Sequence, residues 1–374
     1  MKEGTEKGYT MKKKTLLISL LTIILIFTLA GCKKENEVGE DNTNENNENL
    51  VENNDENEVE NNEEEEDFEE TTFNHIYPLT GIGTNEKVDH RIVGVMINNH
   101  PAARPQSGLS KADLVFEILT EGATTRFLAL FHSEMPDIVG PVRSAREYFF
   151  ELGRDYNAIY VFHGAAQFVL DMISNRSIEH LNGGIHDNDL KLFKRESFRK
   201  APHNSYFLMN NAYEFAEKKG YDITNKLNPL TFISEKDEVK GDGAATRAKI
   251  GYIGKQPYYT VEYSYDEQSE SYFRFSDGVQ SKELNTEDPV RAHNVFIIEA
   301  SHEVIDKEGR RAVDLKSSGQ GILIQKGVKH HVTWENRDGI ITPVKDGKAI
   351  GLVPGKTWIN VVPSLEQSVE VSSE

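Results

Sequence analysis

The residue types best suited to bind an anion gather in one short segment of the sequence. Arg143 comes just before a predicted helix that Ser144 caps, and Arg146 lies in its first turn. A helix N-terminus already favours anions, because it carries unpaired N–H groups and about half a positive charge. Two guanidinium groups there oppose the helix dipole, and a bound phosphate or carboxylate accounts for their position. We therefore predict an anion-binding site, with Arg104 and Arg126 as neighbours from strand ends.

The same arginines also fit a purely structural alternative. Arginines often pair with carboxylates inside a domain, and such pairs need no ligand. The acidic residues available for this are Asp113, Glu117, Glu121 and Glu151. The two alternatives differ in whether the guanidinium groups are already neutralised.

Two histidines occupy positions where an acid or a base could act. His203 lies in the short polar motif APHN at 201–204, and His163 ends a predicted buried strand, where α/β domains tend to place ligands. Histidine exchanges a proton near neutral pH. The alternatives are a hydrogen-bonded loop anchor for His203 and a packed imidazole for His163.

Alternating strands and helices must position these residues. A capping box, Ser144 with Glu147, predicts a helix that runs to about Arg154. The other predicted strands are 91–97, 113–119, 126–132 and 158–162, and the other helices are 165–174 and 211–219. We predict an α/β domain over residues 73–231, a layered mixed sheet with helices.

After residue 228 the helical pattern disappears. The predicted strands there are 258–265, 272–275, 294–299, 321–325, 331–334, 340–344 and 357–362. Turns rich in Gly and Asp separate them. We therefore predict a second, β-rich domain over residues 232–374.

The N-terminus has the pattern of a targeting signal rather than that of a folded domain. Three lysines precede an apolar run at 16–29, and the sequence LAGC at 29–32 places small residues before Cys32. This pattern predicts a lipoprotein signal peptide over residues 1–31. Two acyl chains on Cys32 would anchor the mature protein to the outer face of the cytoplasmic membrane.

Most of the negative charge belongs to a tail. The net charge is −19, yet residues 35–70 hold 18 acidic side chains and no basic one, and residues 71–374 are left with −6. We predict an acidic, disordered tether over residues 32–72. Nothing in the globular part favours a nucleic-acid partner. Because Cys32 is the only cysteine, an internal disulfide and a thiolate metal site are excluded.

The globular part contains six distinctive short motifs. They are PLTG at 78–81, VMINN at 95–99, ARPQSGL at 103–109, GPVRSAR at 140–146, APHN at 201–204 and GKTW at 355–358. On these motifs the chain resembles the YerB-like bacterial lipoproteins, a family of unknown function in both of its halves. The resemblance implies a two-domain envelope lipoprotein and brings no established reaction, so enzymatic activity is left open.

A fainter resemblance supports a transferase alternative. The order of strands and arginines along the chain is similar to that in the LytR-CpsA-Psr enzymes. In those enzymes, arginines bind a lipid pyrophosphate and an acidic residue helps to bind magnesium. Asp113 is the candidate magnesium ligand under this alternative. The acidic residue expected after the first arginine is absent, since Ser144 follows Arg143. No cofactor is predicted otherwise.

Three hypotheses about function follow. The first is a lipid-anchored extracytoplasmic protein that binds an anionic or glycan envelope ligand, an envelope protein, or both. The second is a polyisoprenyl-pyrophosphate glycan transferase, with fixed cations for the departing pyrophosphate. The third is a structural scaffold in which every polar residue named above satisfies the core.

Overall fold

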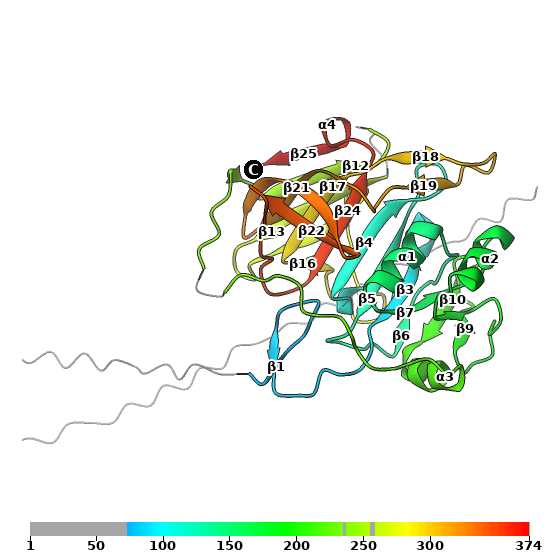
Figure 1. The fold of residues 1–374 in the computed structure, drawn as a ribbon. Coiled ribbons are helices and arrows are strands. Elements are labelled where there is room, and N and C mark those ends of the chain that lie inside the picture. Colours follow the sequence, from blue (N-terminus) through cyan, green and yellow to red (C-terminus); the bar gives the residue numbers. More distant parts are fainter. Residues whose placement is uncertain (1–72, 235–236, 255–258, 374) are drawn as a thin grey trace, which may run out of the picture. The chain divides into compact units, whose positions relative to one another are not determined.

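One large sheet combines strands from both halves of the chain (Figure 1). The structure, a computed structural model, describes residues 73–234, 237–254 and 259–373. In these residues the sheet has 12 strands, with β11 (Gly243–Ala244) paired to β21. The order of the others is β23 (Lys348–Ala349), β22 (Ile340–Lys345), β21 (Val328–Arg337), β20 (Ser318–Gln325), β17 (Asn294–Glu299), β24 (Thr357–Val362), β4 (Leu114–Leu119), β5 (Thr125–Phe131), β3 (Val93–Asn98), β7 (Ile159–Phe162) and β8 (His180–Asn182).

The two halves meet where β24 lies beside β4. These strands run parallel, and Leu114 pairs with Thr357 and Glu117 with Asn360. In Figure 1 the red β24 lies next to the cyan β4. The sheet therefore crosses the position at which the sequence predicts a domain boundary, and the boundary itself stays a prediction.

Smaller sheets pack around the large one. A six-stranded sheet from the C-terminal half has the order β15 (Val279–Gln280), β14 (Ser271–Ser276), β13 (Thr260–Asp266), β12 (Arg247–Gly251) and β25 (Val369–Ser372), with β16 (Arg291–Ala292) paired to β14. A three-stranded sheet has the order β6 (Ile138–Val139), β10 (Ser205–Leu208) and β9 (Phe193–Arg195). Two hairpins join β1 (His75–Ile76) to β2 (Gly83–Thr84) and β18 (His302–Val304) to β19 (Arg311–Val313).

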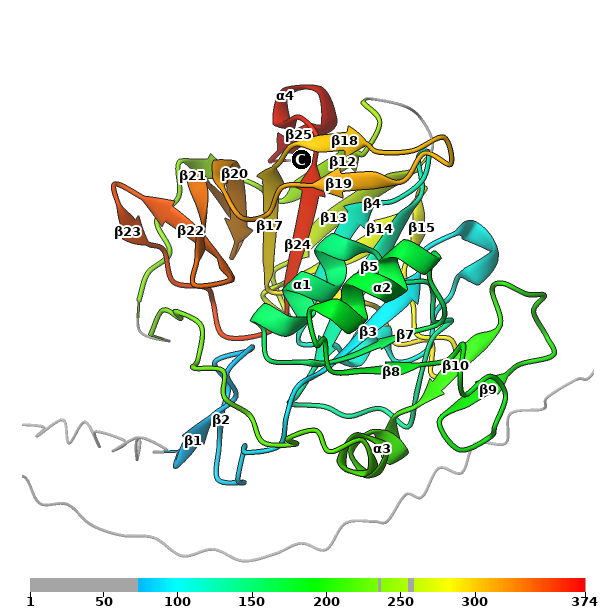
Figure 2. The same cartoon turned by 45° about the vertical axis from the view of Figure 1, so that its right-hand side comes forward.

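The helices are short and cover only part of the sheet. They are α1 (Glu147–Asp155), α2 (Gln167–Asn175), α3 (Ala212–Lys218) and α4 (Leu365–Ser368). Figure 2 shows α1 and α2 in front of the strands of the N-terminal half. Among the described residues, no helix has the length and apolar character needed to cross a membrane.

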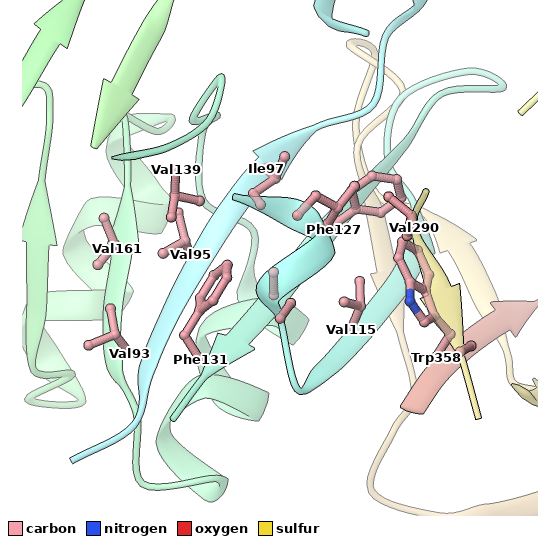
Figure 3. Close-up of a cluster of buried hydrophobic side chains, with 14 of the residues drawn as sticks. Val93, Val95, Ile97, Val115, Phe127, Phe131, Val139, Val161, Val290 and Trp358 are labelled. Atoms are coloured by element: carbon pink, nitrogen blue, oxygen red, sulfur yellow. The ribbon is translucent and has the colours of Figure 1, made fainter. Parts of the chain in front are cut away.

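Two hydrophobic cores lie on opposite faces of the large sheet, because successive side chains of a strand point to opposite faces. On β3, Val93, Val95 and Ile97 belong to the core shared with the six-stranded sheet, and Met96 belongs to the core beneath α1 and α2. Figure 3 shows the first core reaching from these valines to Trp358 on β24. Burial of these faces on both sides of the sheet holds the two halves in one unit.

The prediction of a β-rich C-terminal half is confirmed, whereas the N-terminal half contains more sheet and less helix than expected. Two causes account for the difference. Strands β6 and β8 to β10 are only two to four residues long, too short to show a periodic pattern. In addition, the core on one face of the large sheet is completed largely by strands of the six-stranded sheet rather than by a layer of helices.

Candidate functional site

The topology brings the candidate residues to one edge of the large sheet. Strands β3, β7 and β8 are parallel, and β5 is antiparallel to both β3 and β4, so β3, β4, β7 and β8 all end at the edge where β5 begins. Asn98 at the end of β3 pairs with Arg126 at the start of β5. Glu121 follows β4, His163 follows β7 and Asn182 ends β8. The carboxyl ends of parallel strands are where α/β sheets bind ligands.

The loop that carries Arg143 is held between β3 and β7. The backbone N–H of Arg143 donates to Met96 O at 2.9 Å, and Arg143 O accepts from the N–H of His163 at 3.0 Å. Two residues on, the N–H of Ala145 donates to Gly164 O at 3.1 Å. The loop is therefore fixed to the ends of both strands.

The predicted start of the first helix is wrong by two residues, because the N-cap is Arg146 and not Ser144. Helix α1 begins at Glu147, and Arg146 occupies the N-cap without a side-chain capping bond. Ser144 does not cap the helix, and its carbonyl instead accepts a hydrogen bond from Arg126 Nη1 at 2.7 Å. Because the backbone as far as Ala145 is bonded to the strand ends, the helical turn cannot begin earlier.

Arg126 and Arg146 share one carboxylate. Arg146 Nε donates to Glu121 Oε1 at 2.8 Å, and Arg126 Nη2 lies 3.2 Å from Glu121 Oε2. Both arginines are buried. Burial, together with the charge of Arg146, lowers the pKa of Arg126 to about 9, which leaves it protonated at neutral pH. Burial acts to raise the pKa of Glu121, but the two guanidinium groups hold it below its ordinary value.

Arg143 differs from its neighbours because none of the described carboxylates forms an ion pair with its guanidinium, although the charge of Glu121 acts on it. Its side chain is partly buried, yet it forms neither a hydrogen bond nor an ion pair with any residue that the structure describes. Burial and then the charge of Arg146 lower the pKa of Arg143. Its own charge in turn helps to lower the pKa values of His163 and His203. The edge therefore carries more positive charge than Glu121 can neutralise.

His163 is held in a tautomer that does not suit a general base. Arg195 Nη2 can only donate, so its 3.2 Å contact makes His163 Nε2 the acceptor. His163 Nδ1 then carries the hydrogen and donates to Ser205 Oγ at 2.7 Å. Burial, followed by the charges of Arg195 and Arg143, lowers the pKa of His163. A neutral imidazole that donates to this hydroxyl cannot take its proton, so the pair is not an activated nucleophile.

His203 presents a free N–H. Asn98 Oδ1 accepts from the backbone N–H of His100, so the amide nitrogen of Asn98 is the group that donates to His203 Nδ1 at 2.9 Å. The hydrogen of the neutral ring is therefore on Nε2, which has no hydrogen-bond partner among the described residues. Burial, then His100 and Arg143, lowers the pKa of His203. Its ring stacks on His100 with centroids 4.6 Å apart.

Arg104 does not join this cluster. Its Nη1 lies 2.7 Å from Asp277 Oδ2, and its Nε donates to the backbone and side-chain oxygens of Asn99. Its charge is therefore neutralised by the C-terminal half. The expectation that it neighbours the other three arginines was based on its place after a strand, and the chain turns away in the loop that follows β3.

Asp113 does not fit a magnesium site. It lies at the amino end of β4, the opposite edge from the arginines. One carboxylate oxygen accepts from the N–H groups of His132 and Ser133 at 2.8 and 2.7 Å, and the other accepts from Ser133 Oγ. Burial raises the pKa of Asp113 to about 6. Within the described ranges, no three His, Cys, Asp or Glu residues come together as metal ligands.

Cys32, the predicted lipidation site, lies outside the described residues.

The sequence analysis missed several residues at the arginine edge of the sheet. Asn182 accepts from the N–H groups of Gly164 and Gly184 at 3.1 and 2.8 Å, and so ties the loops after β7 and β8 together. The glycines that follow Asn182 were its only signal in the sequence. Asn98 lies in the motif VMINN at 95–99 but was not singled out as a site residue, and His100 and Arg195 carried no pattern that set them apart.

Comparisons with known proteins find relatives for most of the chain. Residues 79–222 match the model of the protein of unknown function (DUF3048) N-terminal domain, and residues 249–359 match that of the C-terminal domain. A Bacillus subtilis (strain 168) protein named "Putative lipoprotein YerB" is 47% identical over 290 residues, which cover 77% of this chain and 86% of that protein. The crystal structure of YerB from Bacillus subtilis matches with a TM-score of 0.73 and 45% identity, covering 80% of this chain and 99% of that chain.

Proposed function

The chain belongs to the YerB-like family of DUF3048 proteins, and on this basis we propose that it is a lipid-anchored envelope protein whose globular part binds an anionic ligand. The anchor would be Cys32, at the end of the LAGC motif, on the outer face of the cytoplasmic membrane. The name of the Bacillus subtilis relative supports this part of the proposal. The acidic segment at 32–72 would then link the anchor to the globular part.

The single observation that carries the ligand proposal is the unpaired charge of Arg143. The Arg143 guanidinium is partly buried and makes no ion pair with a described carboxylate, so its charge is available to an anionic ligand. Arg126 and Arg146 do find a carboxylate, as the structural alternative expects, but Arg143 does not. A phosphate or carboxylate group would supply the missing charge.

A second donor at the edge, on His203, can bind the same anion. The Nε2–H of His203 is a neutral donor, and the charge of Arg143 acts on its ring. Charge-assisted bonds from a guanidinium to a phosphate or carboxylate are among the stronger hydrogen bonds in proteins. A wall glycan, a lipid or an envelope protein could carry the anionic group, since these donors recognise charge rather than the rest of the ligand.

No described feature favours the transferase alternative. Asp113 lies at the far edge of the sheet, and His163 donates to Ser205 instead of accepting its proton. The proposal is therefore one of binding.

Thermal unfolding tests the ligand proposal. The sample is the mature chain, residues 32–374, with Cys32→Ser so that it carries no lipid. Phosphate should raise the unfolding midpoint above that in chloride of equal ionic strength, because a ligand that binds only the folded state stabilises it. Arg143→Ala should abolish the difference, and Arg247→Ala, which removes an exposed arginine of β12, should keep it. Equal phosphate shifts in all three proteins would refute the site.

A further inference from the structure

A groove borders the arginine edge. It lies between α2, the edge strand β8 and the residues that follow α3, and its volume is about 780 Å³. This is within the range of roughly 300–1,000 Å³ that is typical of small-molecule sites. Its apolar lining consists of Ala165, Leu170, Ile173, Ile178, Ile185 and Tyr221.

The groove and the arginine loop meet at Gly164. This glycine lines the groove, and its carbonyl accepts the hydrogen bond from Ala145 in the arginine loop. Its φ is +68°, and no heavy atom lies within 4 Å of the position where a Cβ would be. Gly164 therefore places no side chain between the arginine loop and the groove.

The groove also exposes apolar side chains that a ligand could cover. Ile185, in the loop after β8, is 70% exposed. Covering such a side chain removes apolar surface from water, which is favourable in proportion to the area buried.

We propose that the anionic ligand is an amphiphile: its phosphate or carboxylate head binds at Arg143 and His203, and its aliphatic chain lies in the groove beside β8. This inference rests on the proposed function, because it takes the anion site as the place of the head. Two features together select this occupant. The cationic edge favours an anion. The adjoining groove has polar residues such as Glu179 and Lys219 on its lining, but its apolar side chains offer a surface that an aliphatic chain can cover.

A series of alkyl phosphates tests the inference. Methyl, butyl, hexyl and octyl phosphate, each kept below the concentration at which it forms micelles, are titrated into the mature chain with Cys32→Ser by calorimetry. Affinity should rise by about fourfold for each methylene that enters the groove, which follows from roughly 0.8 kcal/mol per buried methylene. The rise should stop when the groove is full.

Matched variants separate the head site from the groove. Ile185→Ser should flatten the dependence on chain length and leave methyl phosphate binding unchanged, and because Ile185 is largely exposed this variant should still fold. Val279→Ser, which alters a residue 71% exposed on β15, should change neither. Arg143→Ala should weaken every member of the series about ten- to hundredfold.

The outcomes distinguish the two proposals. If affinity does not depend on the length of the alkyl chain and methyl phosphate still binds, the amphiphile proposal is overturned and the anion site is retained. Octyl phosphate binding that Arg143→Ala does not weaken would overturn the placement of the head, and so both proposals. Absence of binding along the whole series would also overturn both. Binding of an uncharged, extended peptide to the groove without competition from octyl phosphate would assign the groove to a protein partner and overturn the amphiphile.

Discussion

Glu117 on β4 and Arg274 on β14 form an ion pair across the two halves of the chain, with Oε2 and Nη2 2.7 Å apart and side chains 0% and 1% exposed. Thr125 Oγ1 also donates to Glu117, at 2.8 Å. The Arg274 guanidinium lies 4.6 Å from the ring centroid of Trp358. This pair and the joined sheet hold the strands that form the arginine edge.

Removing one partner of this pair should destabilise the protein strongly. Glu117→Ala or Arg274→Ala leaves a buried charge without its partner, which typically costs about 3–5 kcal/mol. The exposed pair of Lys249 and Glu262, 3.3 Å apart, is the control, and Lys249→Ala should cost less than about 1 kcal/mol. Denaturant unfolding measures both, and similar losses would mean that the buried pair is not a main link between the halves.

Arg143 should contribute to binding and not to stability. Arg143→Met removes a cation that no described carboxylate pairs, so unfolding should require as much free energy as before or about 0.5–2 kcal/mol more. Arg146→Met, by contrast, takes one of two guanidinium groups from Glu121 and should cost about 1.5–3 kcal/mol, as expected for hydrogen bonds to a charged group. A large loss of stability in Arg143→Met would show that the residue has a structural partner.

The contribution of Glu121 to stability should depend on acid pH. Its pKa in the folded state lies below the ordinary value of 4.5, since Arg126 and Arg146 favour the charged form. A carboxyl group with a depressed pKa stabilises the fold fully above the unfolded value and loses this effect as the pH falls through the folded one. The difference in unfolding free energy between wild type and Glu121→Gln should therefore be constant above pH 5 and shrink below about pH 4. A difference that stays constant through pH 3 would contradict the pairing.

Sulfate should bind more tightly in mild acid. Sulfate keeps its charge between pH 5 and 8, so any change reflects the protein. The pKa of His203 is below its ordinary value of 6.5, and its protonation adds a positive charge beside Arg143. Affinity should rise about three- to tenfold between pH 7.5 and 5, as expected for one added charge near a surface anion. His203→Gln should show a smaller rise in calorimetric titrations, and an equal rise would assign the effect to another group.

The strands that build the edge could be predicted, but their partners could not. The run RIVGVMI at 91–97 predicted β3 because a continuous apolar segment of that length is typical of a strand buried on both faces. Nothing local to Leu114 or Thr357 indicated that β4 and β24 pair, since more than two hundred residues separate them. The joined sheet therefore had no signal in the sequence.

The candidate site was predicted in part. The motif GPVRSAR placed Arg143 and Arg146 in one loop, and Arg126, which the sequence analysis expected as a neighbour, lies beside Arg146 through Glu121. Sequence alone could not decide which arginine would lack a partner, because Glu121 can reach two of them and not a third. The capping box also failed, since hydrogen bonds from the loop to β3 and β7 outweigh a local capping preference.

The central claim is that Arg143 and His203 together bind an anion, and crystals of the mature chain soaked in tungstate test it most directly. Anomalous diffraction should show one tungsten site within contact distance of the Arg143 guanidinium and His203 Nε2, and soaked crystals of Arg143→Ala should lack it. A tungstate site that persists in Arg143→Ala, or one that forms only away from this edge, would contradict the claim.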